Sequence, residues 1–185
     1  YFLTFRLKGT LPRGITWQLQ QEREELVRQG GGEEQLLAQQ RIQFVKLERI
    51  LDSCQYGPRW LEDPRIAGLV MDAFTWIETE AKWTVLAGVV MPNHVHCLLA
   101  PGEESRALET TMKSVKGFIA REANKLIGRT GQAFWVPESF DHWCRSHEKV
   151  VSVAWYICRN PVKARLVSDW HKWEWTRVVE TLRPQ

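Results

Sequence analysis

Val89-Val90-Met91-Pro92-Asn93-His94-Val95-His96-Cys97-Leu98-Leu99-Ala100 places a polar centre between two apolar runs. Apolar flanks of this kind favour a strand, in which successive side chains point to opposite faces. His94 and His96 then share one face, and Val95 points to the other. Two imidazoles on one face of a buried strand are costly unless a partner satisfies them, and a metal ion is a common partner. We therefore regard His94 and His96 as candidate metal ligands.

The composition around this stretch is that of a folded globular domain. The chain has 185 residues, of which 44% are hydrophobic and 25% are charged, which is enough for one domain with a core. Residues 1–80 carry 10 Lys/Arg and 12 Asp/Glu, whereas residues 81–185 carry 15 and 10. The basic excess lies in the half with the histidines. A polyanionic partner would favour that distribution, and a solvated basic surface explains it about as well.

The cysteines exclude two classes of protein. Cys54, Cys97, Cys144 and Cys158 are scattered and form no Cys-x-x-Cys pair, which argues against a zinc ribbon and against a disulfide framework. They indicate single thiols in a reducing compartment, so we expect a cytoplasmic protein. No apolar run approaches the roughly 18 residues of a transmembrane helix, so no membrane association is expected.

The residues before the histidines predict one strand and three helices. Tyr1–Lys8 is rich in aromatic and β-favouring residues and predicts the first strand. Thr16–Gln29 and Glu33–Ser53 consist of strong helix formers separated by three glycines. The first of these helices has few apolar anchors, so we expect a peripheral helical insertion at about residues 15–60. Asp63-Pro64 begins the next helix, with an N-cap and a proline in the first turn.

A strand and a long helix are predicted on either side of the histidine stretch. Lys82–Met91 favours a strand, in which Gly88 marks a bulge or a close approach of another element. Glu103–Ile127 has apolar residues at three- and four-residue steps and predicts a helix, which Gly128 ends.

The C-terminal third predicts an extended segment, a helix and a last strand. Gln132–Arg145 reads as extended, and Ser146 is a suitable N-cap. The helix His147–Asn160 is expected to stop before Pro161, since proline disfavours helical backbone at the preceding residue. Trp173–Val179 favours a last strand. This order predicts an α+β fold in which helices pack on one face of a mostly antiparallel sheet, as one domain over the whole chain.

Basic residues lie off the apolar face of the long helix. A solvated basic face is one interpretation, and contacts with DNA phosphates are the other. We favour DNA contact. The candidate DNA-binding residues are Lys113, Lys116, Arg121, Lys125, Arg129, Arg145, Lys163 and Arg165.

Tyr156 and Asn160 lie four residues apart and therefore share one face of their helix. Most Tyr/Asn pairs at this spacing have a packing role in the core or on the surface and no catalytic role. Together with His94 and His96, however, the Asn160 amide oxygen makes a three-ligand metal site with open positions. Its nitrogen and oxygen donors suit Mg²⁺ or Mn²⁺ better than structural zinc. Tyr156, one turn away, is then placed to attack a phosphodiester as a covalent nucleophile.

Met91–His96 and Tyr156–Ala164 resemble the two signature motifs of the REP-associated tyrosine transposases. These belong to the single-tyrosine HUH transposases of small IS200-like insertion sequences. The resemblance covers about residues 82–167 and the first strand, and it is weaker over the helical insertion. Arg165 departs from the pattern, because relatives usually have glycine after the Lys-Ala pair.

The resemblance implies a ferredoxin-like (RRM-like) fold and a DNA strand-transfer activity. His94, His96 and Asn160 would hold Mg²⁺ or Mn²⁺. Tyr156 would attack single-stranded DNA and leave a 5′-phosphotyrosine and a free 3′-hydroxyl, and the reverse attack would rejoin the strand. The implied partner is single-stranded or hairpin DNA of REP-like repeats, bound by a monomer or a homodimer associated with the bacterial nucleoid.

Two other functions fit the same residues. One is a domesticated sequence-specific DNA-binding protein that keeps the fold without transposition. The other is a metal-dependent hydrolase that uses His94 and His96 without a covalent tyrosine.

Overall fold

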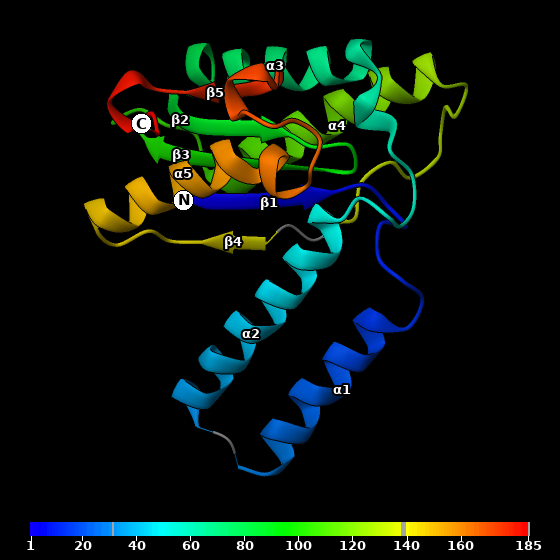
Figure 1. The fold of residues 1–185 in the computed structure, drawn as a ribbon, viewed down its shortest axis with the longest axis vertical. Coiled ribbons are helices and arrows are strands. Elements are labelled where there is room, and N and C mark those ends of the chain that lie inside the picture. Colours follow the sequence, from blue (N-terminus) through cyan, green and yellow to red (C-terminus); the bar gives the residue numbers. More distant parts are fainter. Residues whose placement is uncertain (31, 138–139, 185) are drawn as a thin grey trace.

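The chain forms one antiparallel sheet with helices on both faces (Figure 1). The computed structural model describes residues 1–30, 32–137 and 140–184. The strands are β1 (Phe2–Arg6), β2 (Trp83–Val90), β3 (His94–Pro101), β4 (Phe140–His142) and β5 (Thr176–Val178). The helices are α1 (Ile15–Arg28), α2 (Glu33–Asp52), α3 (Pro64–Thr79), α4 (Leu108–Leu126) and α5 (His147–Lys163), with short 3-10 turns at 60–62, 170–172 and 180–182. The predicted α+β class with an antiparallel sheet is confirmed.

The histidine strand β3 lies at the centre of the sheet, whose order is β4-β1-β3-β2-β5. On one side His96 is opposite Thr4 of β1, and on the other it is opposite Val89 of β2. Strand pleating turns Val95 and Cys97 to one face and therefore His94 and His96 to the other. The period-two prediction for this stretch is confirmed.

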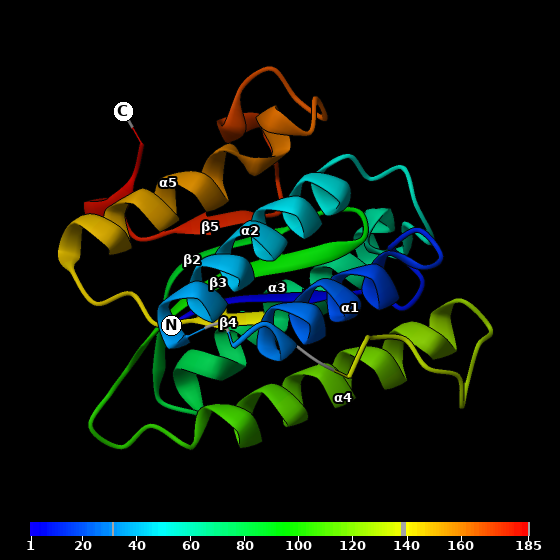
Figure 2. The same ribbon diagram turned by 90° about the horizontal axis from the view of Figure 1, so that it is seen from below.

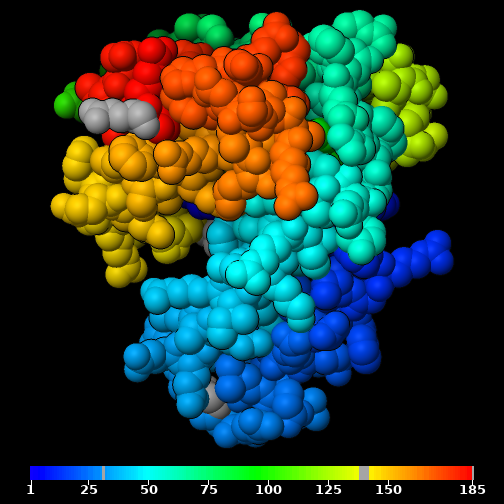
Figure 3. Space-filling view, viewed as in Figure 1, coloured from blue at the N-terminus to red at the C-terminus, as the bar shows by residue number. Residues whose placement is uncertain are grey.

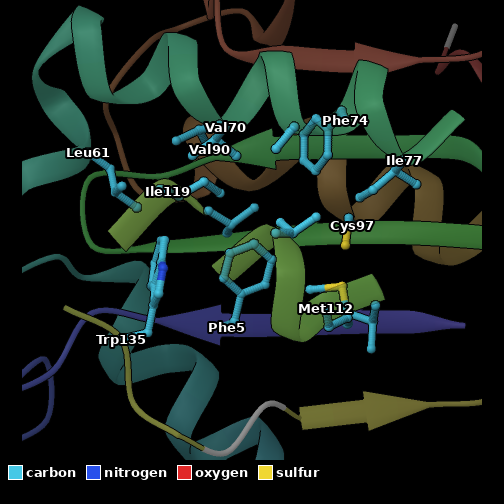
Figure 4. Packing of buried hydrophobic residues seen from close by; sticks show 14 of the residues in the cluster. Phe5, Leu61, Val70, Phe74, Ile77, Val90, Cys97, Met112, Ile119 and Trp135 are labelled. Carbon is cyan, nitrogen blue, oxygen red and sulfur yellow. The ribbon is translucent and has the colours of Figure 1, made fainter. Parts of the chain in front are cut away.

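Helices α3 and α4 cover the face of the sheet that bears Val95 and Cys97 (Figures 2 and 4). Phe5, Phe74 and Ile119 are among the fully buried side chains of this core. The predicted start of α3 is confirmed, since the Asp63 carboxylate accepts a hydrogen bond from the backbone N–H of the second helical residue over 3.0 Å. This layer is the larger of the two cores.

The opposite face of the sheet is also apolar, and α5 packs on it (Figure 2). Val153 and Ile157 of α5 join a second buried cluster with Phe2, Val89 and Leu98. The sequence predicted that the helices pack on one face of the sheet. Helices α3 and α4 do so, but α5 packs on the opposite face, so the prediction is wrong for α5. The physical reason is that strands with apolar residues on both faces need cover on both.

Helices α1 and α2 form a hairpin that stands out from the sheet (Figures 1 and 3). We call it the α1–α2 hairpin. Only Leu19 of α1 is buried, and α2 buries only Glu48 and Leu51. The Gln43 side chain donates to the Leu19 carbonyl over 2.8 Å and joins the two helices. Nowhere in the described ranges does a helix have both the length and the apolar character of a membrane span.

Helix α5 continues through Pro161 to Lys163, so the predicted end at Asn160 is wrong. Because Pro161 lies in the last turn, the helix loses only the one hydrogen bond that the proline nitrogen would have donated. The Pro161 carbonyl still accepts a hydrogen bond, from the N–H of Leu166 over 2.9 Å. This bond is typical of a Schellman helix end.

The same helix end holds Arg165 in the left-handed backbone region, at φ +57°. Its N–H donates to the Val162 carbonyl over 2.9 Å, which is the second hydrogen bond of a Schellman helix end. Glycine is the residue favoured at this position, the first after the C-cap. We expect Arg165→Gly to be more stable than Arg165→Ala by about 1 kcal/mol, because the alanine keeps a Cβ in that region. Chemical unfolding of both variants measures this difference, and equal stabilities would contradict it.

Gly88 in β2 is a point of close approach, as predicted, while the register shift lies between Val85 and Ala87. A Cβ on Gly88 would lie 2.6 Å from Cε2 of Phe74, whose ring is fully buried. We expect Gly88→Ala to lower the free energy of unfolding by about 1–3 kcal/mol.

Gly68 of α3 gives the matched control, since a Cβ there meets nothing within 4 Å. Gly68→Ala should raise helix propensity and leave stability equal or higher by up to about 1 kcal/mol. Thermal and chemical unfolding of both variants test the pair. A Gly88→Ala protein as stable as the parent would show that Phe74 can move aside.

Candidate active site

His94 and His96 are fully buried under α2 and α5, and their Nε2 atoms lie 3.0 Å apart. The other ring nitrogen of each has a partner. His94 Nδ1 lies 2.7 Å from Asn93 Oδ1, and His96 Nδ1 lies 2.8 Å from Thr4 Oγ1. Since an amide oxygen only accepts, His94 carries its proton on Nδ1 and presents a lone pair at Nε2. The Thr4 hydroxyl can also accept, which allows His96 the same tautomer.

Helix α2 brings two carboxylates to these imidazoles. Glu48 and Asp52 are one turn apart and share a face. Glu48 Oε2 lies 3.2 Å from His96 Nε2, and Asp52 Oδ1 lies 3.7 Å from His94 Nε2. Neither acid was predicted from the sequence. The sequence signal for these acids is their four-residue spacing, which places them on one face of the helix. Solvent-exposed helices without a functional site show the same spacing equally often.

Helix α5 brings Tyr156 and Asn160 to the same cluster. The Tyr156 hydroxyl donates a hydrogen bond to Glu48, and its ring centroid lies 5.4 Å from that of His96. Asn160 is fully buried, and neither atom of its amide has a hydrogen-bond partner among the described residues. The four residues predicted from two distant segments therefore lie together, with the two acids of α2 between them.

Burial dominates the electrostatics of this cluster. It raises the pKa of Glu48 to about 8, and the hydrogen bond from Tyr156 opposes that rise. Burial also raises the pKa of Asp52, against the nearby Lys163 ammonium. It lowers the pKa of His94 to about 3 and that of His96 well below its usual value. Both imidazoles are therefore neutral near pH 7, which is the form that binds metals.

The same groups make Tyr156 a poor nucleophile when no cation is bound. Burial raises its pKa above the usual value, and the charges of Glu48 and Asp52 raise it further. The Lys163 ammonium lies 4.4 Å from the centroid of the Tyr156 ring. A divalent cation between the acids and the imidazoles would offset their negative charge and favour ionisation of the hydroxyl.

The residues of the cluster fit a divalent cation. Ligand atoms of Asp52, His94 and His96 lie within 4.8 Å of one another. The two Nε2 atoms face each other, and two lone pairs at that distance repel unless a proton or a cation lies between them. The donor set of imidazole nitrogen with carboxylate and amide oxygen suits a divalent metal ion.

A pocket of about 680 Å³ opens beside the cluster, between α2 and the C-terminal end of α5. Tyr156 lines it together with Lys163 and Arg165, two of the predicted DNA-binding residues. Arg49 of α2 adds a third cation. The nucleophile candidate thus faces a cavity whose walls carry these three cations beside the two acids of α2.

The other predicted DNA-binding residues lie elsewhere. Lys113 and Lys116 line a second pocket of about 780 Å³, formed by α4 and the segment before β4. The sheet separates α4 from α5 (Figure 2). Five of these cations have partners within the protein. Lys116 donates to two backbone carbonyls, and Arg121 and Lys125 pair with Glu122. Arg129 lies over the ring of Trp60, and Arg145 over the ring of Trp143. Their contact with DNA stays a prediction.

Residues 52–160 match the model of a protein family described as "Transposase IS200 like". The match covers more than half of the chain. The chain belongs to the IS200-like transposase family. The matched region of this transposase includes Asp52, both histidines, Tyr156 and Asn160, whereas most of the α1–α2 hairpin precedes it. The family resemblance inferred from the two motifs is confirmed.

The fold of the transposase is similar to that of a solved structure, a REP-associated tyrosine transposase bound to a REP hairpin. The two chains are 16% identical with a TM-score of 0.60, and the similarity covers 99% of this chain and 81% of the other. At that identity the likeness establishes a shared fold. No curated protein matches the sequence.

Proposed function

We propose that this transposase cleaves and rejoins single-stranded DNA, with Tyr156 as the covalent nucleophile. The observation that carries the proposal is one buried cluster built from two distant segments. His94 and His96 of β3 lie beside Tyr156 and Asn160 of α5, about sixty residues later in the sequence. Membership of a transposase family supports the same chemistry.

In this proposal His94, His96 and Asn160 hold a divalent ion, Mg²⁺ or Mn²⁺. Such an ion, when bound, polarises a phosphodiester and stabilises the charge that develops on its oxygens. The hydrogen bond that His94 Nδ1 donates to Asn93 Oδ1, and the one between His96 Nδ1 and Thr4 Oγ1, hold both imidazoles in position.

The proposed reaction exchanges one phosphodiester for another. The Tyr156 oxygen attacks phosphorus, the bond from phosphorus to the 3′ oxygen breaks, and that oxygen takes up a proton. The products are a 5′-phosphotyrosine and a free 3′-hydroxyl. Glu48 accepts the Tyr156 hydrogen bond, so it lies where the hydroxyl proton departs. Attack by a 3′-hydroxyl on the phosphotyrosine reverses the step and rejoins the strand.

We propose a hairpin-bearing single strand as the substrate. Lys163 and Arg165 at the pocket carry charges that suit backbone phosphates. The solved structure of similar fold, a REP-associated tyrosine transposase, was bound to a REP hairpin. Repeats that flank the gene of this protein are therefore the first DNA to test.

The test is a denaturing-gel assay with Mn²⁺ and single strands that carry those repeats. We expect a covalent protein–DNA adduct and a released fragment with a 3′-hydroxyl end. Tight binding of the same DNA without an adduct would contradict the proposed cleavage and favour a DNA-binding protein without transposition. Cleavage without an adduct would favour a metal-dependent hydrolase.

A further inference from the structure

We propose that Asp52 is an additional ligand of the metal ion, supplied by the helical insertion, and that ion binding fixes the α1–α2 hairpin over the site. The inference rests on the proposed metal role of His94 and His96. It adds a carboxylate to the two imidazoles and the Asn160 amide, and it gives the insertion a function in the site.

Two buried groups on different elements support this ligand set. Asp52 Oδ1 is buried and has no hydrogen-bond partner in the part of the chain that the structure describes, although it lies 3.7 Å from His94 Nε2. The amide of Asn160, fully buried on α5, has none either. It lies near enough to Asp52 to interact with that carboxyl and to oppose the rise of its pKa. Unpaired buried polar atoms are rare, and here two elements, α2 and α5, carry them beside the two imidazoles.

The charge of Asp52 is only partly compensated within the protein. Its other oxygen, Oδ2, lies 3.6 Å from Lys163 Nζ, a side chain that is 52% exposed. A half-exposed ammonium at that distance compensates the charge of a largely buried carboxylate only in part. A divalent ion between Asp52 and the two Nε2 atoms would satisfy the buried oxygen and separate the facing lone pairs at the same time.

An ion held in this way would join α2 to β3 and α5. Apart from this site the hairpin has modest anchors on the body of the protein. Phe44 packs edge-on against Phe2 with ring centroids 6.0 Å apart, and the Leu51 carbonyl accepts from the Asn93 amide over 3.4 Å. We therefore infer that the apo-protein opens the hairpin more often than the metal-bound protein does.

Calorimetric titration with Mn²⁺ alone tests the ligand without DNA. We expect Asp52→Ala to weaken Mn²⁺ binding by at least about tenfold. Replacing a residue that only hydrogen-bonds to a metal ligand already lowers metal affinity by about that factor. Asp52→Asn should lie between this variant and the parent. Glu34→Gln is the matched control, since Glu34 is an exposed acid at the other end of α2, and it should bind Mn²⁺ as the parent does.

Limited trypsin digestion tests the coupling to the hairpin. Arg41, Lys46 and Arg49 of α2 offer cleavage sites. Mn²⁺ should slow cleavage at these sites in the parent and in Glu34→Gln, and should have no such effect in Asp52→Ala. Protection of Asp52→Ala by Mn²⁺ to the parental degree would overturn the coupling.

The outcomes separate this inference from the proposed function. Parental Mn²⁺ affinity in Asp52→Ala, with a DNA adduct still formed, would overturn the ligand and leave the function standing. Weakened Mn²⁺ binding in Asp52→Ala, with no adduct from the parent, would support the ligand and remove the function. Thermal unfolding in EDTA checks the fold of each variant. If Asp52→Ala does not fold, Asp52→Asn decides, and parental affinity in that variant overturns the proposal.

Discussion

Replacing Tyr156 by phenylalanine should abolish the covalent protein–DNA adduct, with a rate loss of at least about 10⁴-fold, and leave DNA binding nearly unchanged. The reason is that the substitution removes one oxygen and keeps the ring. The ring packs edge-on against Phe2 and His96 at centroid distances of 6.0 and 5.4 Å, and phenylalanine preserves these contacts. The lost hydrogen bond to Glu48 costs about 0.5–1.5 kcal/mol of stability, too little to unfold the protein.

The matched control is Tyr56→Phe. Tyr56 lies in a turn, is 42% exposed, and stands outside the cluster, so this variant should form the adduct at the parental rate. The measurement is the denaturing-gel assay with a hairpin-bearing single strand, paired with a native binding assay on the same DNA. A full-strength adduct from Tyr156→Phe would refute the assignment of the nucleophile.

Replacing His94 by alanine is expected to remove Mn²⁺ binding and to slow cleavage by about 10²–10³-fold or more. The ion contributes several kcal/mol to charge stabilisation in such reactions, and each 1.4 kcal/mol is a factor of ten in rate. Excess chelator should reduce the parent protein to the same rate. Both effects are measured by calorimetry with Mn²⁺ and by the initial rate of adduct formation.

The fold of this variant has to be checked, because His94 is fully buried and its loss leaves Asn93 Oδ1 with only the weak thiol donor of Cys54. We expect a cost of about 1–3 kcal/mol, measured by chemical unfolding in EDTA. His171→Ala is the control: this histidine is 57% exposed, pairs with Asp169, and should change neither Mn²⁺ binding nor rate. Cleavage that persists in chelator would contradict a role for metal.

The strand with the histidines and the helix with Tyr156 were predictable because their information is local. Alternating side chains place His94 and His96 on one face, and a four-residue step places Tyr156 and Asn160 on another. Each pattern depends only on the local backbone conformation, and it does not depend on which elements pack around it. Resemblance to a known family then related the two segments, and the structure brings them into contact.

The acids of the site were not predictable, because their role depends on where α2 lies. Glu48 and Asp52 sit on a helix that is mostly exposed, and only its docking across β3 turns them towards the imidazoles. Thr4 is a similar case, since it meets His96 through the register of β1 with β3. The end of α5 was misjudged because the rule for residues before proline is a preference, which a last helical turn can override.

The alternation along β3 has one more consequence, for errors in folding. If β3 slipped by one residue against its neighbours, both imidazoles would enter the apolar layer under α3, and Val95 and Cys97 would turn towards the acids of α2. Such a misfolded chain would bury polar rings without partners and forfeit much of its larger core at once. Correct register of β3 is thus required by the larger core and by the pair of imidazoles alike. A chain with β3 out of register would lose both, so selection for a stable core also selects for the face on which the metal ligands lie.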